Sequence, residues 1–352
     1  MTVSLDAIVD KASAKPEALL RLARVLLAKG DGAKARDIAM RALKAAPGDP
    51  LVAALAGELL NHGVPDWHFS LVRDRARNQA YDAALRRVIR PGMRVLDIGS
   101  GTGLLAMMAA SAGATDLVTS EMNPPVAEAA RQIIAKNGFA DRIRVIAKNS
   151  SEIDAEADMG GRADLLVSEI VSNDMVAEDA LPAHEQAFRR LLKPNAIVIP
   201  AKGVVRVALA EDRKIGHRRM TQVEGFDVTP FNMLAPPRYR IPVGDERLVL
   251  KSAAADALLF DFQSGGPFPE SRAEAAVTAN AEGANGIVQW IRLDMDGQGH
   301  YEDAPAPGTS SAWATQFHPF PDGFRVAQSE TIRVICEHDR HRLRIWPSRE
   351  KP

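Results

Sequence analysis

Short apolar runs alternate with amphipathic stretches through the middle of the chain. Four of these runs have the length and composition of buried parallel strands: 95–98, 117–120, 143–147 and 163–168. Stretches with helical spacing follow three of them, at 104–112, 124–137 and 180–192. Strands that alternate with helices predict an α/β fold, with a doubly wound parallel sheet covered by helices on both faces.

The pattern changes after Pro200, where helical periodicity nearly vanishes. Strand-like runs with alternating or continuous apolar residues lie at 204–209, 258–263, 286–294 and 342–346. Turns rich in Gly, Pro and Asp separate them. This second half therefore predicts an antiparallel sheet or β-barrel domain appended to the first.

The beginning of the chain is rich in alanine with helical spacing over 16–50. Gly30-Asp31-Gly32 separates two apolar stripes, and Pro47 stops the second. The small residues on these stripes match the spacing of a tetratricopeptide helix pair, and 51–60 resembles the first helix of a second unit. A lone repeat cannot bury its own face, so these helices either pack on the rest of the chain or offer a groove to a protein partner.

We therefore expect three domains. These are a tetratricopeptide-like helical segment over 1–62, a nucleotide-binding domain over 63–199 that opens with a mixed aromatic and basic helix over 66–91, and a β-barrel domain over 200–352. A length of 352 residues suits two or three domains, and 46% hydrophobic with 25% charged residues is an ordinary globular balance.

Charge, apolar run length and cysteine content argue against a nucleic-acid-binding, membrane-spanning or secreted protein. A net charge of −1 provides no basic field to favour nucleic acid, and no apolar run approaches the ~18 residues that span a membrane. Asp6 and Asp10 without a basic stretch do not resemble a secretory signal. The single cysteine, Cys336, excludes an internal disulfide and favours a reducing, cytoplasmic location. Cys336-x-His338-x-x-His341 has too few ligands for a metal site, so we interpret it as structural and expect no metal.

The first apolar strand runs into a glycine-rich turn that includes Gly99 and Gly101, followed by a helix. Strand, glycine turn and helix form the opening unit of a nucleotide-binding sheet. Asp97 at the strand end suits an ammonium group, and Glu121, at the next strand end, suits ribose hydroxyls. S-adenosylmethionine offers both groups. NAD offers only the ribose and remains a distant alternative, although the glycine pattern alone also fits it.

Two carboxylates follow the fourth strand, Glu169 and, nine residues on, Glu178. In open α/β sheets, ligands bind at the carboxyl ends of strands. Paired carboxylates suit a planar guanidinium, which donates two parallel hydrogen bonds. Taken alone, an acidic loop is more often simply solvated. His184 and Glu185, on the following helix, are expected at the surface, as is the Arg218-Arg219 pair.

From Trp67 to about residue 325, the chain resembles the protein arginine methyltransferases, most closely the monomethylating branch and the branch that carries tetratricopeptide repeats. The matching segments occur in the family's order: Trp67-His68-Phe69 with Asp74-x-x-Arg77-Asn78-x-x-Tyr81, Val95 to Gly103, Ser120-Glu121-Met122, Ser168 to Glu178, Glu224 to Asp227 and Leu259 to Phe262. The resemblance implies a class I methyltransferase with a Rossmann-like sheet. It also implies a substrate that is an arginine-containing protein, a peptide or free arginine.

The resemblance also implies roles for individual residues. His68 and Arg77 would bind the methionine portion of S-adenosylmethionine, with Arg77 holding its carboxylate and Asp97 close by. The other implied contacts are Gly99 and Gly101 in the glycine loop, Glu121 on the ribose, Ser150 and Ser151 at the adenine, Glu169 and Glu178 around the guanidinium, and Trp313 at the substrate.

The chain departs from the family in a barrel turn. Ser311-Ala312-Trp313 matches a Thr-His-Trp-like turn, so Ala312 replaces a histidine that helps to order the site in the resembling family. Two alternatives therefore stay open beside arginine methylation. One is methylation of a substrate without a guanidino group, and the other is a cofactor-binding scaffold with little catalysis.

The segment 211–245 interrupts the strand pattern soon after the barrel begins. It is charged at first and then carries Phe226, Phe231, Met233 and Leu234. In the resembling family an insertion here forms a dimerisation arm. We therefore expect a homodimer in which apolar arm residues dock on the partner's α/β domain.

Overall fold

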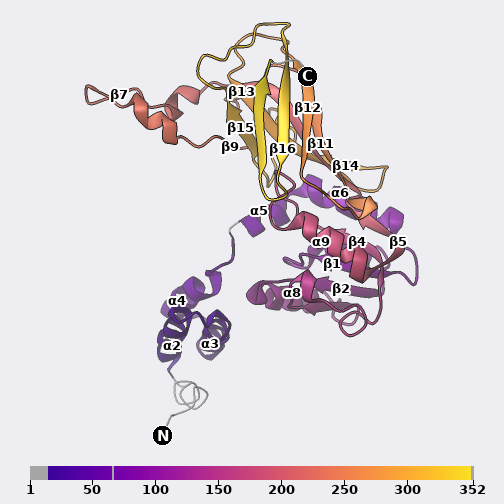
Figure 1. Cartoon of the computed structure of the whole chain (residues 1–352). Helices are drawn as coiled ribbons and strands as arrows, with labels where there is room; N and C mark the ends of the chain where they lie inside the picture. The colour runs from indigo at the N-terminus through magenta and orange to yellow at the C-terminus, as the bar shows by residue number, and fades with distance from the viewer. Residues whose placement is uncertain (1–14, 66, 350–352) are drawn as a thin grey trace.

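The computed structural model describes residues 15–65 and 67–349, so the expectations for residues 1–14 and for Asp66 lie outside it. Three helices come first: α2 (Pro16–Ala28), α3 (Gly32–Ala45) and α4 (Pro50–Asn61). They bury their small and apolar faces against one another and form a core of their own. Asp31 and Asp49 cap α3 and α4 by accepting backbone N–H bonds. Figure 1 shows this cluster beside α8, away from the barrel.

The single helix expected over 66–91 is in fact two helices, α5 (Trp67–Arg73) and α6 (Arg75–Val88). Asp74 separates them because its carboxylate accepts the Arg77 N–H at 3.0 Å and so caps α6. Helix α5 contains no buried residue, whereas α6 buries Arg77 and Tyr81. The prediction of one continuous helix was therefore wrong at Asp74.

The central sheet has five parallel strands in the order β3-β2-β1-β4-β5. The strands are β1 (Arg94–Ile98), β2 (Asp116–Ser120), β3 (Ile143–Ile146), β4 (Ala163–Ser168) and β5 (Leu192–Ile199). The connecting helices are α7 (Leu104–Ser111), α8 (Pro124–Lys136), η1 (Ser150–Glu152), α9 (Ala180–Gln186) and the π-helical η2 (Ala187–Leu191). This confirms the predicted doubly wound sheet. The strand order reverses between β1 and β4, which is where such sheets bind ligands.

The second half forms the expected antiparallel barrel, whose strands stand above the parallel sheet in Figure 1. One sheet contains β6 (Lys202–Asp212), β9 (Tyr239–Ile241), β10 (Leu248–Leu250), β11 (Ala255–Asp261), β13 (Gly286–Asp294), β14 (His300–Glu302) and β15 (Thr315–Pro319). The other contains β12 (Ser271–Thr278), β16 (Thr331–His338) and β17 (Leu343–Ser348), and η5 (Phe262–Ser264) follows β11. No helix in the described ranges has the length and apolar character needed to cross a bilayer.

Between β6 and β9 the chain forms an arm that projects from the barrel (Figure 1). It contains η3 (Ile215–Arg218), β7 (Gln222–Val223), β8 (Phe226–Asp227) and η4 (Thr229–Leu234). The root of the arm is closed by a hydrogen bond of 2.7 Å from the Tyr239 hydroxyl to the Asp212 carboxylate. Phe226 and Met233 are exposed, so the arm carries its apolar residues into solvent.

The barrel and the loop after β4 pack closely at Gly203 of β6. A Cβ atom at this position would lie 2.8 Å from Met175 Sδ and 2.9 Å from the ring of Phe262. Both approaches are closer than side chains normally tolerate. Gly203 therefore allows the barrel to fit against the Glu169–Glu178 loop.

We expect Gly203→Ala to destabilise the barrel by about 1–3 kcal/mol, because the added methyl overpacks this contact. Gly216→Ala is the matched control, since no atom lies within 4 Å of the position of its Cβ. Chemical denaturation followed by tryptophan fluorescence, to which the buried Trp290 of the barrel contributes, measures the stability of both variants. Equal stability of the two variants would contradict the assignment.

Candidate active site

The glycine loop after β1 has an open cradle. Gly99 and Gly101 have φ angles of 89° and 50°, in the region that favours glycine. A Cβ on Gly99 would lie 2.6 Å from the Ile170 side chain, so only glycine fits there. At Gly101 no atom lies within 4 Å of the Cβ position. A ligand can therefore approach the main chain at Gly101.

The two acids predicted at the cofactor lie at neighbouring strand ends. Glu121 accepts the N–H groups of Gly101 at 3.1 Å and of Asn123 at 2.9 Å, so both of its oxygens are held by backbone. Asp97 is fully buried and accepts the Thr119 hydroxyl at 2.7 Å through Oδ2, while Oδ1 has no hydrogen-bond partner among the described residues. Burial raises the pKa of Asp97 to about 7. A buried, half-satisfied carboxylate fits a cationic group such as an ammonium.

The remaining residues predicted to bind the cofactor lie near the carboxyl ends of the parallel strands. His68 is half-buried on α5, and its ring lies 4.0 Å from that of Trp67. Desolvation lowers the pKa of His68 and the charge of Glu121 opposes the shift, so the two side chains are close enough to interact. Ser150 and Ser151 form η1 after β3. The Ser151 N–H already donates to Asn149 at 2.9 Å.

Glu169 is already paired with a guanidinium. Its Oε2 lies 2.8 Å from Nη1 of Arg77, and the two side chains are only 8% and 4% exposed. The hydrogen bonds of the Arg77 side chain go to Asn78, from Nη2 at 2.8 Å and from Nε at 3.2 Å. Burial raises the pKa of Glu169 to about 8, Glu178 and Asp97 add to the rise, and Arg77 opposes it. The structure therefore joins Arg77, predicted at the cofactor, to an acid predicted at the substrate.

Glu178 lies at the other end of the loop in strained backbone. Met175, Glu178 and Asp179 have φ angles of 66°, 61° and 55°, each costing roughly 1–3 kcal/mol for a residue with a side chain. Glu178 is exposed, yet the surrounding protein removes enough water to raise its pKa, and Asp174 adds to that rise. In the described part of the chain its carboxylate has no hydrogen bond or ion pair. Unlike Glu169, it is free to accept a ligand.

Asp74 connects α6 to the barrel turn. One of its oxygens caps α6, and the other accepts the Tyr301 hydroxyl at 2.9 Å and the Ala312 N–H at 3.0 Å. Ser311 shares the Tyr301 hydroxyl at 2.8 Å. Trp313, predicted at the substrate, is buried with its ring 5.7 Å from that of Tyr301. Asp74 entered the sequence analysis only as part of the motif that resembles the family, with no role assigned, and nothing in the sequence indicated Tyr301.

His184 was predicted at the surface, and this was wrong: it is 1% exposed. Its Nδ1 lies 2.8 Å from the Ala180 carbonyl, which only accepts, so Nδ1 carries the proton and Nε2 accepts from the Ser168 hydroxyl at 3.0 Å. Burial lowers its pKa to about 4. Since Ser168 immediately precedes Glu169, His184 supports the backbone from which Glu169 extends.

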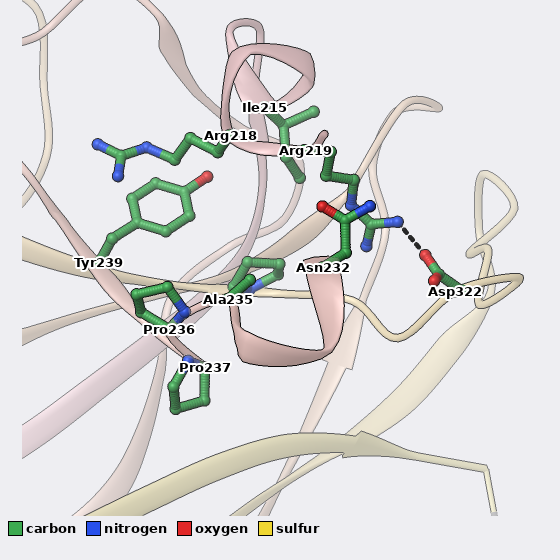
Figure 2. Close-up of a pocket in the computed structure, with 10 residues that line it drawn as sticks. Ile215, Arg218, Arg219, Asn232, Ala235, Pro236, Pro237, Tyr239 and Asp322 are labelled. Carbon is green, nitrogen blue, oxygen red and sulfur yellow. Dashed lines mark hydrogen bonds and ion pairs between the residues drawn. The ribbon is translucent and has the colours of Figure 1, made fainter. Parts of the chain in front are cut away.

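A separate cavity of about 400 Å³ lies at the root of the arm. Figure 2 shows Arg218 beside the ring of Tyr239 and the ion pair between Arg219 and Asp322. No predicted site residue lines this cavity. Within residues 15–65 and 67–349, no group of three or more His, Cys, Asp or Glu side chains is placed to hold a metal ion.

The fold and the glycine loop define a Rossmann-like methyltransferase, and family models agree. Residues 82–201 match the model described as ribosomal protein L11 methyltransferase (PrmA). Residues 3–59 match a tetratricopeptide repeat model.

Curated relatives identify the family within this class. The chain is 38% identical over 293 residues to arginine N(omega)-methyltransferase of Streptomyces achromogenes subsp. streptozoticus, a match that covers 82% of this chain and 80% of the relative. It is 40% identical over 331 residues to protein arginine N-methyltransferase 7 of Bos taurus, covering 80% of this chain and 45% of that protein. The chain belongs to the arginine N-methyltransferase family, whose members use S-adenosylmethionine. It spans less than half the length of the vertebrate relatives.

Solved structures show the same fold at low identity. A chain of the Trypanosoma brucei PRMT1 enzyme–prozyme heterotetrameric complex with AdoHcy aligns with a TM-score of 0.70 and 21% identity, covering 82% of this chain and all of that chain. Arabidopsis thaliana protein arginine methyltransferase 10 aligns with a TM-score of 0.65 and 18% identity, covering 76% of this chain and 86% of that chain. The joined parallel sheet and barrel are therefore the architecture of these enzymes.

The pKa of Glu169 leads to a pH prediction. If Glu169 holds a guanidino substrate, kcat/KM should rise as pH passes through about 8, because the charged carboxylate binds a guanidinium more strongly than the neutral acid does. In Glu178→Gln the loss of a neighbouring negative charge lowers the pKa of Glu169, so the rise should move to lower pH. The exposed Glu152→Gln should leave it in place. Methyl transfer measured from pH 6 to 10 checks this, and a flat profile would contradict it.

Proposed function

We propose that this chain transfers a methyl group from S-adenosylmethionine to a guanidino nitrogen of arginine, held by Glu169 and Glu178. The substrate is a protein, a peptide or free arginine. The observation that carries the proposal is the buried pairing of Glu169 with the Arg77 guanidinium at 2.8 Å. It supports the idea that this carboxylate accepts a flat cation in a site with little water, where such a contact is strong.

The residues at the carboxyl edge of the sheet fit the cofactor. The unpartnered oxygen of Asp97 suits the ammonium group, the open cradle at Gly101 suits close approach of the ligand, and Glu121 suits the ribose hydroxyls. His68 flanks Glu121, and Ser150 and Ser151 follow the next strand. When bound, S-adenosylmethionine supplies an electrophilic methyl group on a sulfonium. If Arg77 binds the carboxylate of the cofactor, it must release Glu169 to the substrate.

The two glutamates act on the substrate in three ways. Each accepts N–H bonds and draws the guanidinium charge towards the nitrogen that it holds, which leaves the third nitrogen richer in electrons. Together they fix the plane of the group, and such positioning supplies most of the acceleration in a direct displacement. The methylated nitrogen must also lose a proton. Glu169, with a pKa near 8, is suited to accept it.

We also propose the following organisation of the whole protein. The chain divides at about residues 62 and 199, and the exposed apolar residues of the arm dock on the α/β domain of a second copy. The N-terminal helices, which bury one another, leave their outer surface for a protein partner. The buried, lone Cys336 suits a reducing cytoplasm.

Glu169→Gln should lower kcat/KM for guanidino substrates by roughly 10²-fold or more, because the neutral amide cannot draw charge and presents one donor where an acceptor is needed. Affinity for S-adenosylmethionine, measured by calorimetry, should not fall, because Arg77 no longer has to leave a carboxylate in order to bind the cofactor. The exposed Glu156→Gln is the control. Full activity of Glu169→Gln on another nucleophile would favour a substrate without a guanidino group. Cofactor binding without turnover in the wild type would favour a scaffold.

Replacing Phe226 and Met233 together by serine should convert the dimer into a monomer, because both side chains are exposed on the arm, at 73% and 86%. Val25→Ser, on the exposed face of α2, removes a comparable apolar side chain elsewhere and should leave the dimer intact. Light scattering at micromolar concentration measures the mass. A monomeric wild type would overturn the arm's proposed role.

A further inference from the structure

Arg238 is the last residue of the arm before the chain re-enters the barrel. The next residue, Tyr239, begins β9, which pairs with β15, and its hydroxyl is bonded to Asp212 on the opposite side of the root. The Arg238 side chain therefore extends from a backbone position that is fixed by the barrel on one side and by the arm on the other.

The Arg238 guanidinium reaches the loop that carries the two glutamates. Its Nη2 donates to Oδ2 of Asp174 at 3.1 Å, and Asp174 is 3% exposed. The other carboxylate oxygen of Asp174 accepts the Ser172 hydroxyl at 2.6 Å and the Ala177 N–H at 3.2 Å. One oxygen thus closes the turn that leads to Glu178, and the other is anchored to the arm.

Arg238 is the one cation paired with Asp174 in the described ranges. His318 lies close to Arg238. Burial and the charge of Arg238 lower the pKa of His318 to about 3, so this histidine is neutral and adds no second positive charge. His318 also bonds Gln289 at 3.2 Å, and Gln289 donates to the Asn173 carbonyl at 2.5 Å. The barrel therefore holds the loop at Asn173 through neutral groups, whereas the arm holds it at Asp174 through the charge of Arg238.

The groups around Glu178 are mostly acidic. Asp174 interacts with it from within the loop, and Glu169 interacts with it from the end of β4, where Arg77 offsets part of the negative charge. A buried carboxylate that loses its cation is strongly destabilised. Without Arg238, Asp174 would therefore no longer close the turn in its present form.

We propose that Arg238 is a positioning residue for Glu178: by pairing with Asp174 it holds the strained turn that presents Glu178, and it makes that turn depend on the root of the arm. The inference rests on the proposed function of Glu178. It assigns the arm's return segment a role in the reaction beyond its apolar surface.

The test compares Arg238→Met with Arg240→Met, the same change two residues away on the exposed side of β9. Arg238→Met should lower kcat/KM for free arginine or an arginine peptide by about 10²-fold, the loss expected from a misplaced group. Cofactor affinity should stay within twofold. Arg238→Lys, which keeps the charge, should recover most of the activity, and Arg240→Met should match the wild type.

A double-mutant cycle with Asp174→Asn separates positioning from folding. Removing both charges avoids an unpaired buried carboxylate, so Asp174→Asn/Arg238→Met should fold even if Arg238→Met does not. In the Asp174→Asn background, Arg238→Met should cost less than twofold, because both changes act through one contact. A 10²-fold loss that persists in this background, or an Arg238→Met variant with the kcat/KM of the wild type, overturns the inference alone. A wild type without transfer overturns the proposed function, and the inference with it.

Discussion

Burial of carboxylates is the constraint on which the site depends. Asp97, Glu169 and Asp174 all lose nearly all contact with water, although an isolated buried carboxylate is among the most costly groups in a folded protein. Each is compensated differently. Asp97 has one hydroxyl and an unused oxygen, Glu169 has Arg77, and Asp174 has loop donors and Arg238. Arg77 and Arg238 thus lie where their charges offset the cost of burying a carboxylate. Each of them joins two elements that are distant in the sequence.

The sequence predicted those elements whose signal lies within a short stretch of residues. A short apolar run ending in glycines predicted β1 and its loop, and the period of two predicted the barrel strands, because both signals lie within ten residues. Glu169 was predicted at a strand end because parallel strands end at a common edge. His184 was missed since its burial depends on Phe262, stacked at 4.5 Å from another domain. The contact between Asp74 and Tyr301 was missed for the same reason, since the two residues are 227 positions apart. Contacts between distant segments produce no periodic pattern of apolar residues in the sequence.

Ala312 lies in the barrel turn Ser311-Ala312-Trp313 and shows that this turn keeps its position with a small residue. The histidine of the resembling family is absent at this position, yet the turn is attached to α6. The Ala312 N–H and the Tyr301 hydroxyl both donate to the oxygen of Asp74 that does not cap the helix. Backbone N–H groups survive any substitution except proline. The attachment of the turn is therefore independent of the residue type at 312, and the replacement does not by itself argue for an idle site.

The Arg77–Glu169 pair also limits how the site can operate. Arg77 extends from α6, whose start is fixed by Asp74, and Glu169 extends from the end of β4, whose backbone is bonded to Tyr81 on the same helix at 2.9 Å. In the function proposed above, a guanidino substrate held by Glu169 must therefore displace a guanidinium of the protein. The exchange replaces one charge-assisted contact by another of the same kind, so it avoids leaving Glu169 buried and unpaired. What it requires is a second anion for Arg77. A cofactor that carries a carboxylate provides one, so the proposed function requires the cofactor to bind before the substrate.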